Sequence, residues 1–351
     1  MSVEVTTDET RFEGRYEVST HADAVGGGGA GINNGGMDLL NGGGTGGVDD
    51  GDTAGAVADG WAGINNYPYH LWKFGTMNIR SGKEKSEGAR IYTITKEVAN
   101  AKLSFCSLQE VKYRGNGNEI ISLPSGEKYA FIWCGMKKRR EAGVAILIKV
   151  CSDIEFEEPD ILDPRLIAIN IQIRGFKLRL INVYSPTNSD GSEAAKDLFY
   201  KKIRNACKKH CRNQKLIING DFNATTSMSL YQSYFDGKAT MEDPLCNDNG
   251  MRIKAFCREM KVVMTQTYFD HPVNERYTWY SPNSVTKKVL VYILMEPFIN
   301  NYTLECKVLT SNELDIDSDH RMAIMKTPLT KQARKQQEKI PNKIKIDFKV
   351  A

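Results

Sequence analysis

Residues 166–183 read LIAINIQIRGFKLRLINV, two apolar runs separated by Gly175. Short runs that are rich in β-branched residues and interrupted by glycine are typical of two strands joined by a tight hairpin. The strands of a hairpin are antiparallel, so this segment argues against a sheet that is wholly parallel and doubly wound. It favours a mixed sheet.

Similar runs, bounded by turn residues, occur on both sides of this hairpin. Besides 166–173 and 177–183, we predict strands at 71–79, 103–108, 129–134, 143–148, 216–218, 276–280, 289–295, 303–309 and 321–325. The 3.6-residue spacing of apolar side chains predicts helices at 84–101, 193–211 and 251–260. Many strands with a few helices among them favour an α/β fold in which helices cover layered mixed sheets.

The first 60 residues differ in composition from the rest of the 351-residue chain. They contain 11 acidic and 2 basic residues and 16 of the 30 glycines, whereas residues 61–351 carry a net charge of +13. A segment so rich in glycine and acidic residues buries too little apolar surface to offset its ordering entropy. We therefore predict a disordered acidic tail at 1–66, one folded domain at 67–328 and a basic tail at 329–351.

The sequence disfavours a membrane protein and a secreted protein. No apolar run approaches the roughly 20 residues that a bilayer-spanning helix needs, and the N-terminus lacks the basic and apolar regions of a signal peptide. The eight cysteines form no C-x-x-C pair and mostly lie within apolar runs, as expected of buried free thiols. We therefore predict an intracellular protein.

Several predicted strands end in polar residues that a strand interior would not tolerate. These residues are Asn78, Glu110, Asp221 and Asn223, and the pair Asp319 and His320 precedes a further strand. Ligands bind beyond strand ends in layered α/β proteins, and carboxylate and amide oxygens suit Mg²⁺ or Mn²⁺. The pattern predicts phosphate-ester hydrolysis at a divalent-metal site. Each residue taken singly also fits a solvated strand end, a turn or a helix cap.

The order of these residues along the chain identifies a family resemblance. The successive motifs of the endonuclease/exonuclease/phosphatase superfamily resemble Met77-Asn78-Ile79, Leu108-Gln109-Glu110, Asn182-Val183-Tyr184-Ser185-Pro186, Gly220-Asp221-Phe222-Asn223 and Ser318-Asp319-His320. Residues 112–117, 247–252 and 278–282 further resemble the apurinic-endonuclease-like domain of RTE-type non-LTR retrotransposons and of the related craniofacial development protein 2-like proteins. The resemblance covers about residues 72–326.

The resemblance implies a four-layer sandwich, in which two mixed β-sheets pack face to face with helices outside. It also implies a divalent cation, Mg²⁺ or Mn²⁺, held by Glu110 with help from Asn78 and with Asp319 close by. The active site would lie at one end of the strands.

The resemblance assigns catalytic roles as well. Asp221 would orient or deprotonate the attacking water, and Asn223 would hold that water and the developing phosphorane. Tyr184 would contact the scissile phosphate, Asp319 would lie near the leaving group, and His320 would stabilise charge on the phosphoryl oxygens.

Position 291 departs from the family pattern. In relatives the strand after the Thr-Trp-x-Ser-Pro motif carries an Asp that accepts a hydrogen bond from the catalytic His, whereas this chain has Val291. A valine can neither fix the tautomer of His320 nor favour its protonated form. We therefore predict an impaired site.

Four residues are predicted to contact nucleic acid. Arg139 and Arg140 precede a predicted strand, where a loop can bring their charges to a phosphate backbone. Asn249 lies in the retroelement-like motif, and Trp279 could stack on a base. A Trp in a strand is also commonly a core or sheet-surface residue.

The sequence thus predicts a Mg²⁺-dependent, DNA-nicking endonuclease domain of retrotransposon origin, which implies a nuclear location and DNA as the partner. No Tyr/Phe-x-Asp-Asp polymerase signature follows residue 326, as expected of a domesticated or fragmentary copy. The main alternative, kept open by Val291, is a catalytically inactive nucleic-acid or protein-binding remnant of the same fold. Another is a phosphatase or RNA nuclease of the same superfamily. The sequence does not indicate an oligomeric state.

Overall fold

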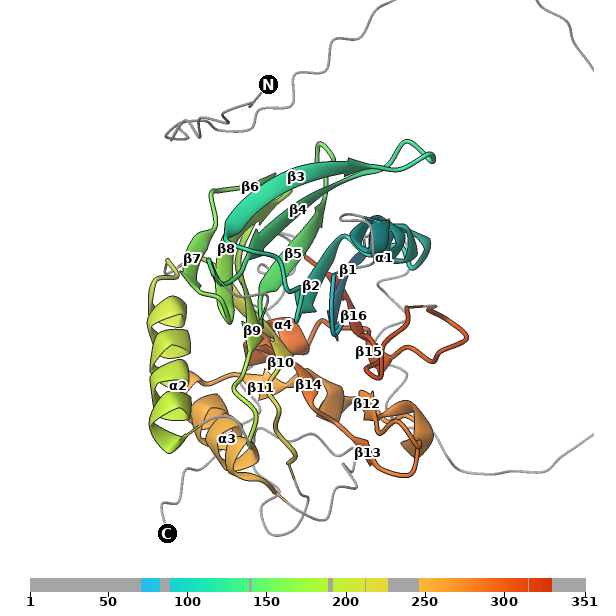
Figure 1. Ribbon diagram of the computed structural model, residues 1–351. Coiled ribbons are helices and arrows are strands. Elements are labelled where there is room, and N and C mark those ends of the chain that lie inside the picture. Colours follow the sequence, from blue (N-terminus) through green and yellow to red (C-terminus); the bar gives the residue numbers. More distant parts are fainter. Residues whose placement is uncertain are drawn as a thin grey trace, which may run out of the picture. The chain divides into compact units, whose positions relative to one another are not determined.

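The computed structural model describes residues 71–82, 89–138, 141–188, 192–211, 213–226, 246–314 and 316–329 (Figure 1). The predicted acidic tail, Arg139, Arg140 and the predicted basic tail beyond Leu329 lie outside these residues. Within the described residues, no helix is long and apolar enough to cross a membrane.

Two mixed sheets form the centre of the domain. Sheet A has the strand order β15 (Glu305–Val308), β16 (Ala323–Pro328), β1 (Leu71–Asn78), β2 (Phe105–Gln109), β5 (Val144–Lys149), β4 (Lys128–Cys134) and β3 (Asn116–Ser122). Sheet B has the order β11 (Val263–Met264), β14 (Val291–Met295), β10 (Lys215–Asp221), β9 (Phe176–Tyr184), β8 (Leu166–Ile173) and β6 (Ile154–Phe156), and β7 (Asp160–Asp163) also pairs with β8. A small hairpin joins β12 (Trp279–Tyr280) to β13 (Lys287–Lys288).

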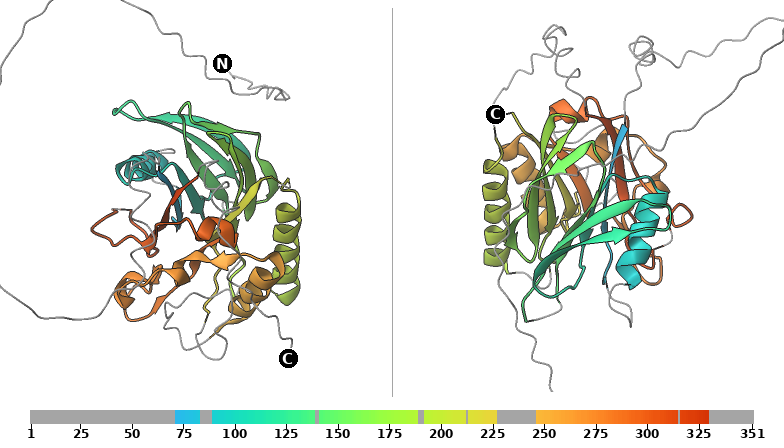
Figure 2. Two further views of the ribbon diagram at one scale, coloured as in Figure 1. Left: turned by 180° about the vertical axis from the view of Figure 1, so that it is seen from behind. Right: turned by 90° about the horizontal axis from the view of Figure 1, so that it is seen from above.

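Helices α1 (Ala89–Asn100), α2 (Glu193–Lys208) and α3 (Asp248–Met260) lie outside the two sheets (Figures 1 and 2). The short α4 (Pro297–Asn300) instead packs with Ile299 against the apolar cluster between the sheets, and 3₁₀ turns form at η1 (Thr265–Tyr268) and η2 (Val273–Glu275). Helix α1 packs on sheet A, while α2 and α3 pack on sheet B. The resulting helix–sheet–sheet–helix order is the predicted four-layer sandwich.

The alternation of side chains along each strand produces three apolar clusters. On β10, Ile217 packs between the sheets while its neighbour Ile218 packs under α2 and α3. A strand buried on both faces needs consecutive apolar residues, and β10 has them in Leu216, Ile217 and Ile218. Burying one such side chain contributes about 1.5–3 kcal/mol, so the central strands hold the layers together.

The predicted hairpin at residues 166–183 is confirmed. Strands β8 and β9 are antiparallel, with Leu166 opposite Val183 and Ile173 opposite Phe176. The two turn residues, Arg174 and Gly175, have φ angles of 46° and 77°. Positive φ at both positions is the geometry of a type I′ turn, which matches the twist of the flanking strands.

Several element predictions need correction. Strand β3 was not predicted, because most of its side chains are exposed and its sequence, NGNEIIS, shows no clear alternation. Helix α3 starts three residues earlier than predicted, because the Asn247 side chain caps it by accepting a hydrogen bond from the Gly250 N–H at 2.7 Å. The predicted strand at 276–280 shortens to β12.

The parallel strand pairs bring the motif residues to one edge of the sandwich. Strand β1 is parallel to β2, and Asn78 at the end of β1 is paired with Gln109 at the end of β2. Strand β9 is likewise parallel to β10, and Tyr184 is paired with Asp221. The carboxyl ends of four strands therefore open onto one region, two from each sheet.

Candidate active site

A single amide joins the two sheets at this edge. The buried side chain of Asn78 donates from Nδ2 to Glu110 Oε1 at 2.8 Å and to Asp221 Oδ2 at 2.9 Å. Its Oδ1 accepts from the backbone N–H of Arg80 at 2.9 Å, which fixes the orientation of the amide. Asn78 thereby brings one carboxylate from each sheet to the same place.

Glu110 is held ionised by its surroundings. It adopts a left-handed conformation with φ 54°, which is costly for a residue with a side chain and is typical of functional sites. Burial favours the neutral acid, but hydrogen bonds from Asn78 and Tyr184 and the charge of Lys112, 3.2 Å from Oε2, hold the pKa of Glu110 below its usual value. Glu110 is therefore anionic at neutral pH, with the charge and the oxygen atoms that a hard cation needs from a ligand.

The pKa of Asp221 shifts in the opposite direction. Burial raises the pKa of this fully buried carboxyl, although the nearby His320 and hydrogen bonds from Asn78 and Asn223 oppose the rise. Its Oδ1 accepts from the backbone N–H of Asn223 at 2.9 Å, and Asn223 is itself left-handed, with φ 47°. Two neighbouring carboxyls whose environments move their pKa values apart are typical of a site that uses one as ligand and the other as base.

Tyr184 is a hydrogen-bond donor at the same centre. Its hydroxyl donates to Glu110 Oε1 at 2.8 Å. Burial, followed by the negative charges of Glu110 and Asp221, raises the pKa of Tyr184 well above its usual value. The phenol therefore stays protonated, and it can donate its one proton to an anionic substrate only by releasing Glu110.

The sequence reasoning missed Arg165, which lies over Tyr184. The guanidinium carbon is 4.7 Å from the centre of the phenol ring, a cation–π contact. Its Nη1 donates to the Ser185 carbonyl at 3.5 Å, and no carboxylate pairs with it among the described residues. Because its other N–H donors have no protein acceptor there, Arg165 offers a positive charge for a phosphate. Its position just before a predicted strand, next to Pro164, was the available signal.

Asp319 is oriented by Trp279. The indole Nε1 donates to Asp319 Oδ2 at 3.1 Å, and Arg80 Nε lies 3.5 Å from Oδ1. Asp319 Oδ1 is buried and accepts no hydrogen bond from the described residues. The N–H of Trp279 is thus committed to positioning a carboxylate, and a stacking contact of its ring with nucleic acid stays a prediction.

His320 reaches the site through Ser318. The Ser318 hydroxyl donates to the Asn78 carbonyl at 2.9 Å and accepts from the His320 backbone N–H at 3.1 Å. The imidazole is almost wholly buried, and its Nδ1 has no hydrogen-bond partner in the part of the chain that the structure describes. Buried ring nitrogens in proteins usually have a hydrogen-bond partner, from the protein or from ordered water.

The family pattern predicts that partner at position 291, where this chain has a valine. Val291 lies opposite Asp221 in the antiparallel β10–β14 pair, so both side chains are on the same face of sheet B. Thr278 connects it to the histidine segment, since its hydroxyl accepts from the Val291 N–H at 3.1 Å and its carbonyl accepts from the Arg321 N–H at 2.8 Å. The fully buried side chain of Val291 offers no acceptor.

Asn249 is not a surface contact. Its side chain is fully buried and its Nδ2 donates to the Pro186 carbonyl at 2.9 Å. The prediction that Asn249 touches nucleic acid is therefore wrong, because its motif starts helix α3 and its amide faces the protein interior.

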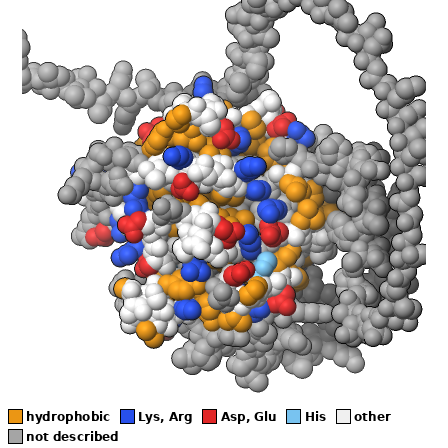
Figure 3. All heavy atoms as spheres, turned by 90° about the vertical axis from the view of Figure 1, so that its right-hand side faces the viewer, with side chains coloured by type: hydrophobic (Ala, Val, Ile, Leu, Met, Phe, Trp, Pro, Cys, Tyr) orange, Lys and Arg blue, Asp and Glu red, His pale blue; other side chains and the backbone are white. Residues whose placement is uncertain are grey.

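A cavity of about 310 Å³ opens beside Asp319 and His320. Apolar side chains such as Met77, Leu314 and Met322 line much of it. Figure 3 shows one face of the domain, where acidic and basic side chains are interspersed. The net positive charge is thus not gathered into one large patch on this face.

The chain resembles known proteins in sequence and in fold. No family model matches the chain. The sequence is 25% identical over 252 residues to craniofacial development protein 2 of Bos taurus, a match that covers 72% of this chain and 40% of that relative. The chain thus spans less than half the length of the curated relative.

Two solved structures show the same architecture. The endonuclease domain of TRAS1, a telomere-specific non-LTR retrotransposon, is 14% identical with a TM-score of 0.50, covering 74% of this chain and all of that domain. The AP endonuclease LMAP of Leishmania major is 13% identical with a TM-score of 0.53, covering 76% of this chain and 90% of that one. The chain therefore has the fold of the endonuclease/exonuclease/phosphatase superfamily, as its ordered motifs predict.

Proposed function

We propose that this protein is a divalent-metal-dependent phosphodiesterase that nicks DNA. The observation that carries the proposal is the Asn78 amide, which holds Glu110 and Asp221 together at 2.8 and 2.9 Å. The pKa of Glu110 is lowered and that of Asp221 is raised. A carboxyl with a lowered pKa suits a metal ligand, and a carboxyl with a raised pKa suits a general base.

The residues at this edge fit a hard cation. Glu110 is an anionic oxygen donor, and Asp319 Oδ1 is a buried carboxylate oxygen without a hydrogen bond from the described residues. Mg²⁺ keeps several waters and commonly uses one or two carboxylates with substrate phosphate, so a larger acidic cluster is not needed. When bound, the ion would neutralise developing negative charge on the phosphate. Glu110, Asn78 and Asp319 would hold it.

The chain's own residues then have distinct tasks. Asp221 would accept the proton of the attacking water, and Asn223 would orient that water. The Tyr184 hydroxyl and the Arg165 guanidinium would donate to phosphate oxygens, and His320 would face the phosphoryl group. The net charge of +13 over residues 61–351 supports a polyanionic substrate such as DNA.

A supercoiled-plasmid assay tests the proposal. We expect the full-length protein to nick the plasmid with Mg²⁺ and to stop when EDTA removes the metal. Glu110→Ala should slow nicking by at least 100-fold, because it removes the anionic ligand, and loss even of supporting partners at metal sites costs about 10–100-fold. Glu119→Ala serves as the control, because Glu119 is an exposed carboxylate on β3. Equal rates for the two variants would contradict the assignment.

DNA binding should depend strongly on salt. If Arg165 and other cations neutralise phosphates, log Kd should vary with log[salt] with a slope of about 0.9 per neutralised phosphate. Fluorescence anisotropy with a labelled duplex gives this slope. The salt concentration is varied from about 50 to about 200 mM, a range over which phosphate contacts weaken strongly. A slope near zero would remove nucleic acid as the ligand.

A second candidate function is a DNA-binding or protein-binding module without catalysis. Val291 and the His320 Nδ1 that has no partner within the described residues favour it, because they remove one orienting interaction from the site. The two functions differ in one measurement: a binding module would retain the salt-dependent DNA affinity and would leave the supercoiled plasmid intact under all metal conditions.

A further inference from the structure

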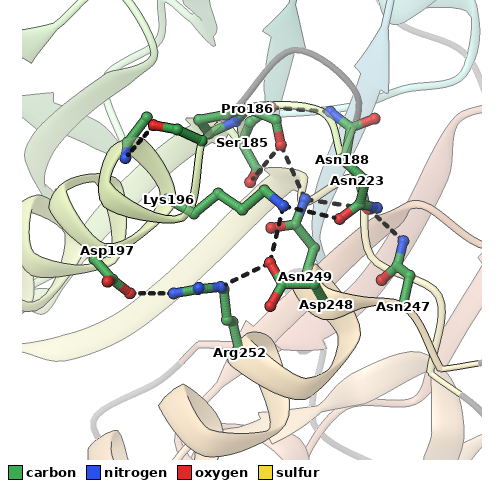
Figure 4. Close-up of polar contacts among 12 residues, drawn as sticks. Ser185, Pro186, Asn188, Lys196, Asp197, Asn223, Asn247, Asp248, Asn249 and Arg252 are labelled. Carbon is green, nitrogen blue, oxygen red and sulfur yellow. Dashed lines mark hydrogen bonds and ion pairs between the residues drawn. The ribbon is translucent and has the colours of Figure 1, made fainter.

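Three amides converge on one backbone carbonyl beside the site. The Asn223 carbonyl accepts from Asn247 Nδ2 at 2.9 Å, from Asn249 Nδ2 at 3.3 Å and from Asn188 Nδ2 at 3.4 Å (Figure 4). The donors come from the loop after β9, the cap of α3 and its first turn. This is an unusual concentration of donors on a single oxygen, which has two lone pairs.

The convergence explains how Asn223 keeps its strained backbone. A non-glycine residue stays left-handed only where its surroundings hold it there. The N–H of Asn223 is fixed by Asp221 Oδ1 at 2.9 Å, and its side-chain Nδ2 by the Ser185 carbonyl at 2.9 Å. The amides at the carbonyl fix the remaining end of the residue.

Asn249 is the most informative of the three donors. It is fully buried, and its Nδ2 is shared between the carbonyls of Asn223 and Pro186, which belong to the loops after β10 and β9. Its Oδ1 is buried and accepts no hydrogen bond from the described residues. The hydrogen bonds of this side chain within the described residues are therefore those that its N–H groups donate. Those groups connect the loop that follows Tyr184 to the loop that carries Asn223.

The first turn of α3 is held firmly enough to act as this connection. A Cβ at Gly250 would lie 2.0 Å from the Thr225 carbonyl, so only glycine allows the turn to approach the loop so closely. On the other side, the buried Lys196 of α2 donates to Asp248 Oδ2 at 2.9 Å, and Arg252 donates to the same oxygen at 2.9 Å. Figure 4 shows these contacts where α2 and α3 meet.

We propose that Asn249 is a positioning residue that sets the site geometry through Asn223, without touching the substrate. Helix α3 would thereby fix the side chain that orients the attacking water. This inference rests on the proposed nuclease function. It differs from the predicted nucleic-acid contact, because Asn249 then affects turnover and leaves DNA affinity unchanged.

The test compares two substitutions of Asn249, each of which removes its N–H donors. Asn249→Ala removes the amide, and Asn249→Asp keeps its size while replacing the donor group with an acceptor. Ile253→Val, a buried position one turn along α3, is the control for loosened packing. We expect kcat for plasmid nicking to fall by about 10–100-fold in both Asn249 variants. KM and DNA affinity should change by less than about threefold, because the phosphate-binding cations are untouched.

A double-mutant cycle separates positioning from general damage. If Asn249 acts through the side chain of Asn223, adding Asn249→Ala to Asn223→Ala should cause no further loss of kcat. A loss of kcat that persists undiminished in the Asn223→Ala background would overturn the inference. So would a kcat within twofold of the wild type in Asn249→Ala, or an equal loss in Ile253→Val.

Hydrogen exchange gives a readout that does not need activity. The Asn223 N–H, bonded to Asp221, should exchange at least tenfold faster in Asn249→Ala than in Ile253→Val, as measured by NMR. Unchanged exchange at Asn223 would overturn the inference even if activity fell. If the wild type does not nick DNA, the proposed function fails, and the exchange result alone still decides whether Asn249 holds Asn223.

Discussion

Asp221→Asn should slow DNA nicking by roughly 10²–10⁴-fold, the usual contribution of a general base, while DNA affinity stays within about threefold. The amide keeps the size of the carboxylate and one oxygen that can accept from the Asn223 N–H. It cannot accept a proton from water. The loss should therefore appear in kcat and hardly in KM.

The substitution also changes one hydrogen bond, which makes a stability measurement necessary. The new NH₂ group would face Asn78 Nδ2, so a hydrogen bond worth about 0.5–1.5 kcal/mol is lost. Relief from burying a charge offsets part of that loss. Asp153→Asn is the matched control, since Asp153 pairs with Arg174 at the outer end of sheet B. Its nicking rate should equal that of the wild type.

The pH dependence of the rate adds an independent check. A base must be ionised to act, so the wild-type rate should fall as the pH drops through the pKa of Asp221. Burial raises that pKa above the ordinary Asp value of about 3.9, so the fall should begin at a higher pH than for an ordinary carboxyl. The residual rate of Asp221→Asn should not show this fall. A variant that nicks at the wild-type rate at every pH would remove Asp221 from the mechanism.

The fold could be predicted where burial dictates the side chains. Strands β8, β9 and β10 are largely buried, and their sequences are rich in Leu, Ile and Val, with an obvious turn at Gly175 between the first two. The edge strand β3 has one buried residue, Ile121, and its pairing with β4 depends on backbone hydrogen bonds that leave no trace in the side-chain pattern. The hydrophobic periodicity of a sequence does not reveal edge strands of this kind.

The site could be predicted as a set of residues and not as an arrangement. Motif order placed Asn78, Glu110 and Asp221 together, because parallel strands end at one edge. The Asn78 bridge and the burial of Asn249 depend on loops whose course is set by left-handed residues such as Asn223. Arg165 belongs to no motif, and only its cation–π contact with Tyr184, 19 positions away, places it at the site.

Val291→Asp should raise kcat for nicking by about 10–100-fold, the range that supporting partners contribute at metal sites. Val291 shares a sheet face with Asp221, and Thr278 lies between its strand and the segment of His320. A carboxylate there could accept a hydrogen bond from the His320 Nδ1, which the described residues leave without one. That bond would fix the tautomer and favour the imidazolium, which stabilises negative charge on the phosphate.

The structure also predicts the cost of this substitution. Position 291 is fully buried, so a carboxylate that finds no partner would cost about 1–3 kcal/mol. It would lie directly opposite Asp221, and like charges facing each other across two strands are destabilising. An imidazolium between the two carboxylates would offset that repulsion. The gain in rate and the retention of stability therefore depend on the same histidine.

Four proteins separate these effects: wild type, Val291→Asp, Val291→Asn and Val291→Asp with His320→Ala. Val291→Asn has a similar size and polarity without the charge, so it reports what burial of a polar group costs by itself. Nicking rate per folded molecule and melting temperature are measured for each. A rate increase in Val291→Asp that is absent in Val291→Asn and disappears with His320→Ala would establish the pairing. If Val291→Asp and Val291→Asn lower the melting temperature alike and neither gains activity, the carboxylate does not reach His320, and the missing Asp is not what limits this site.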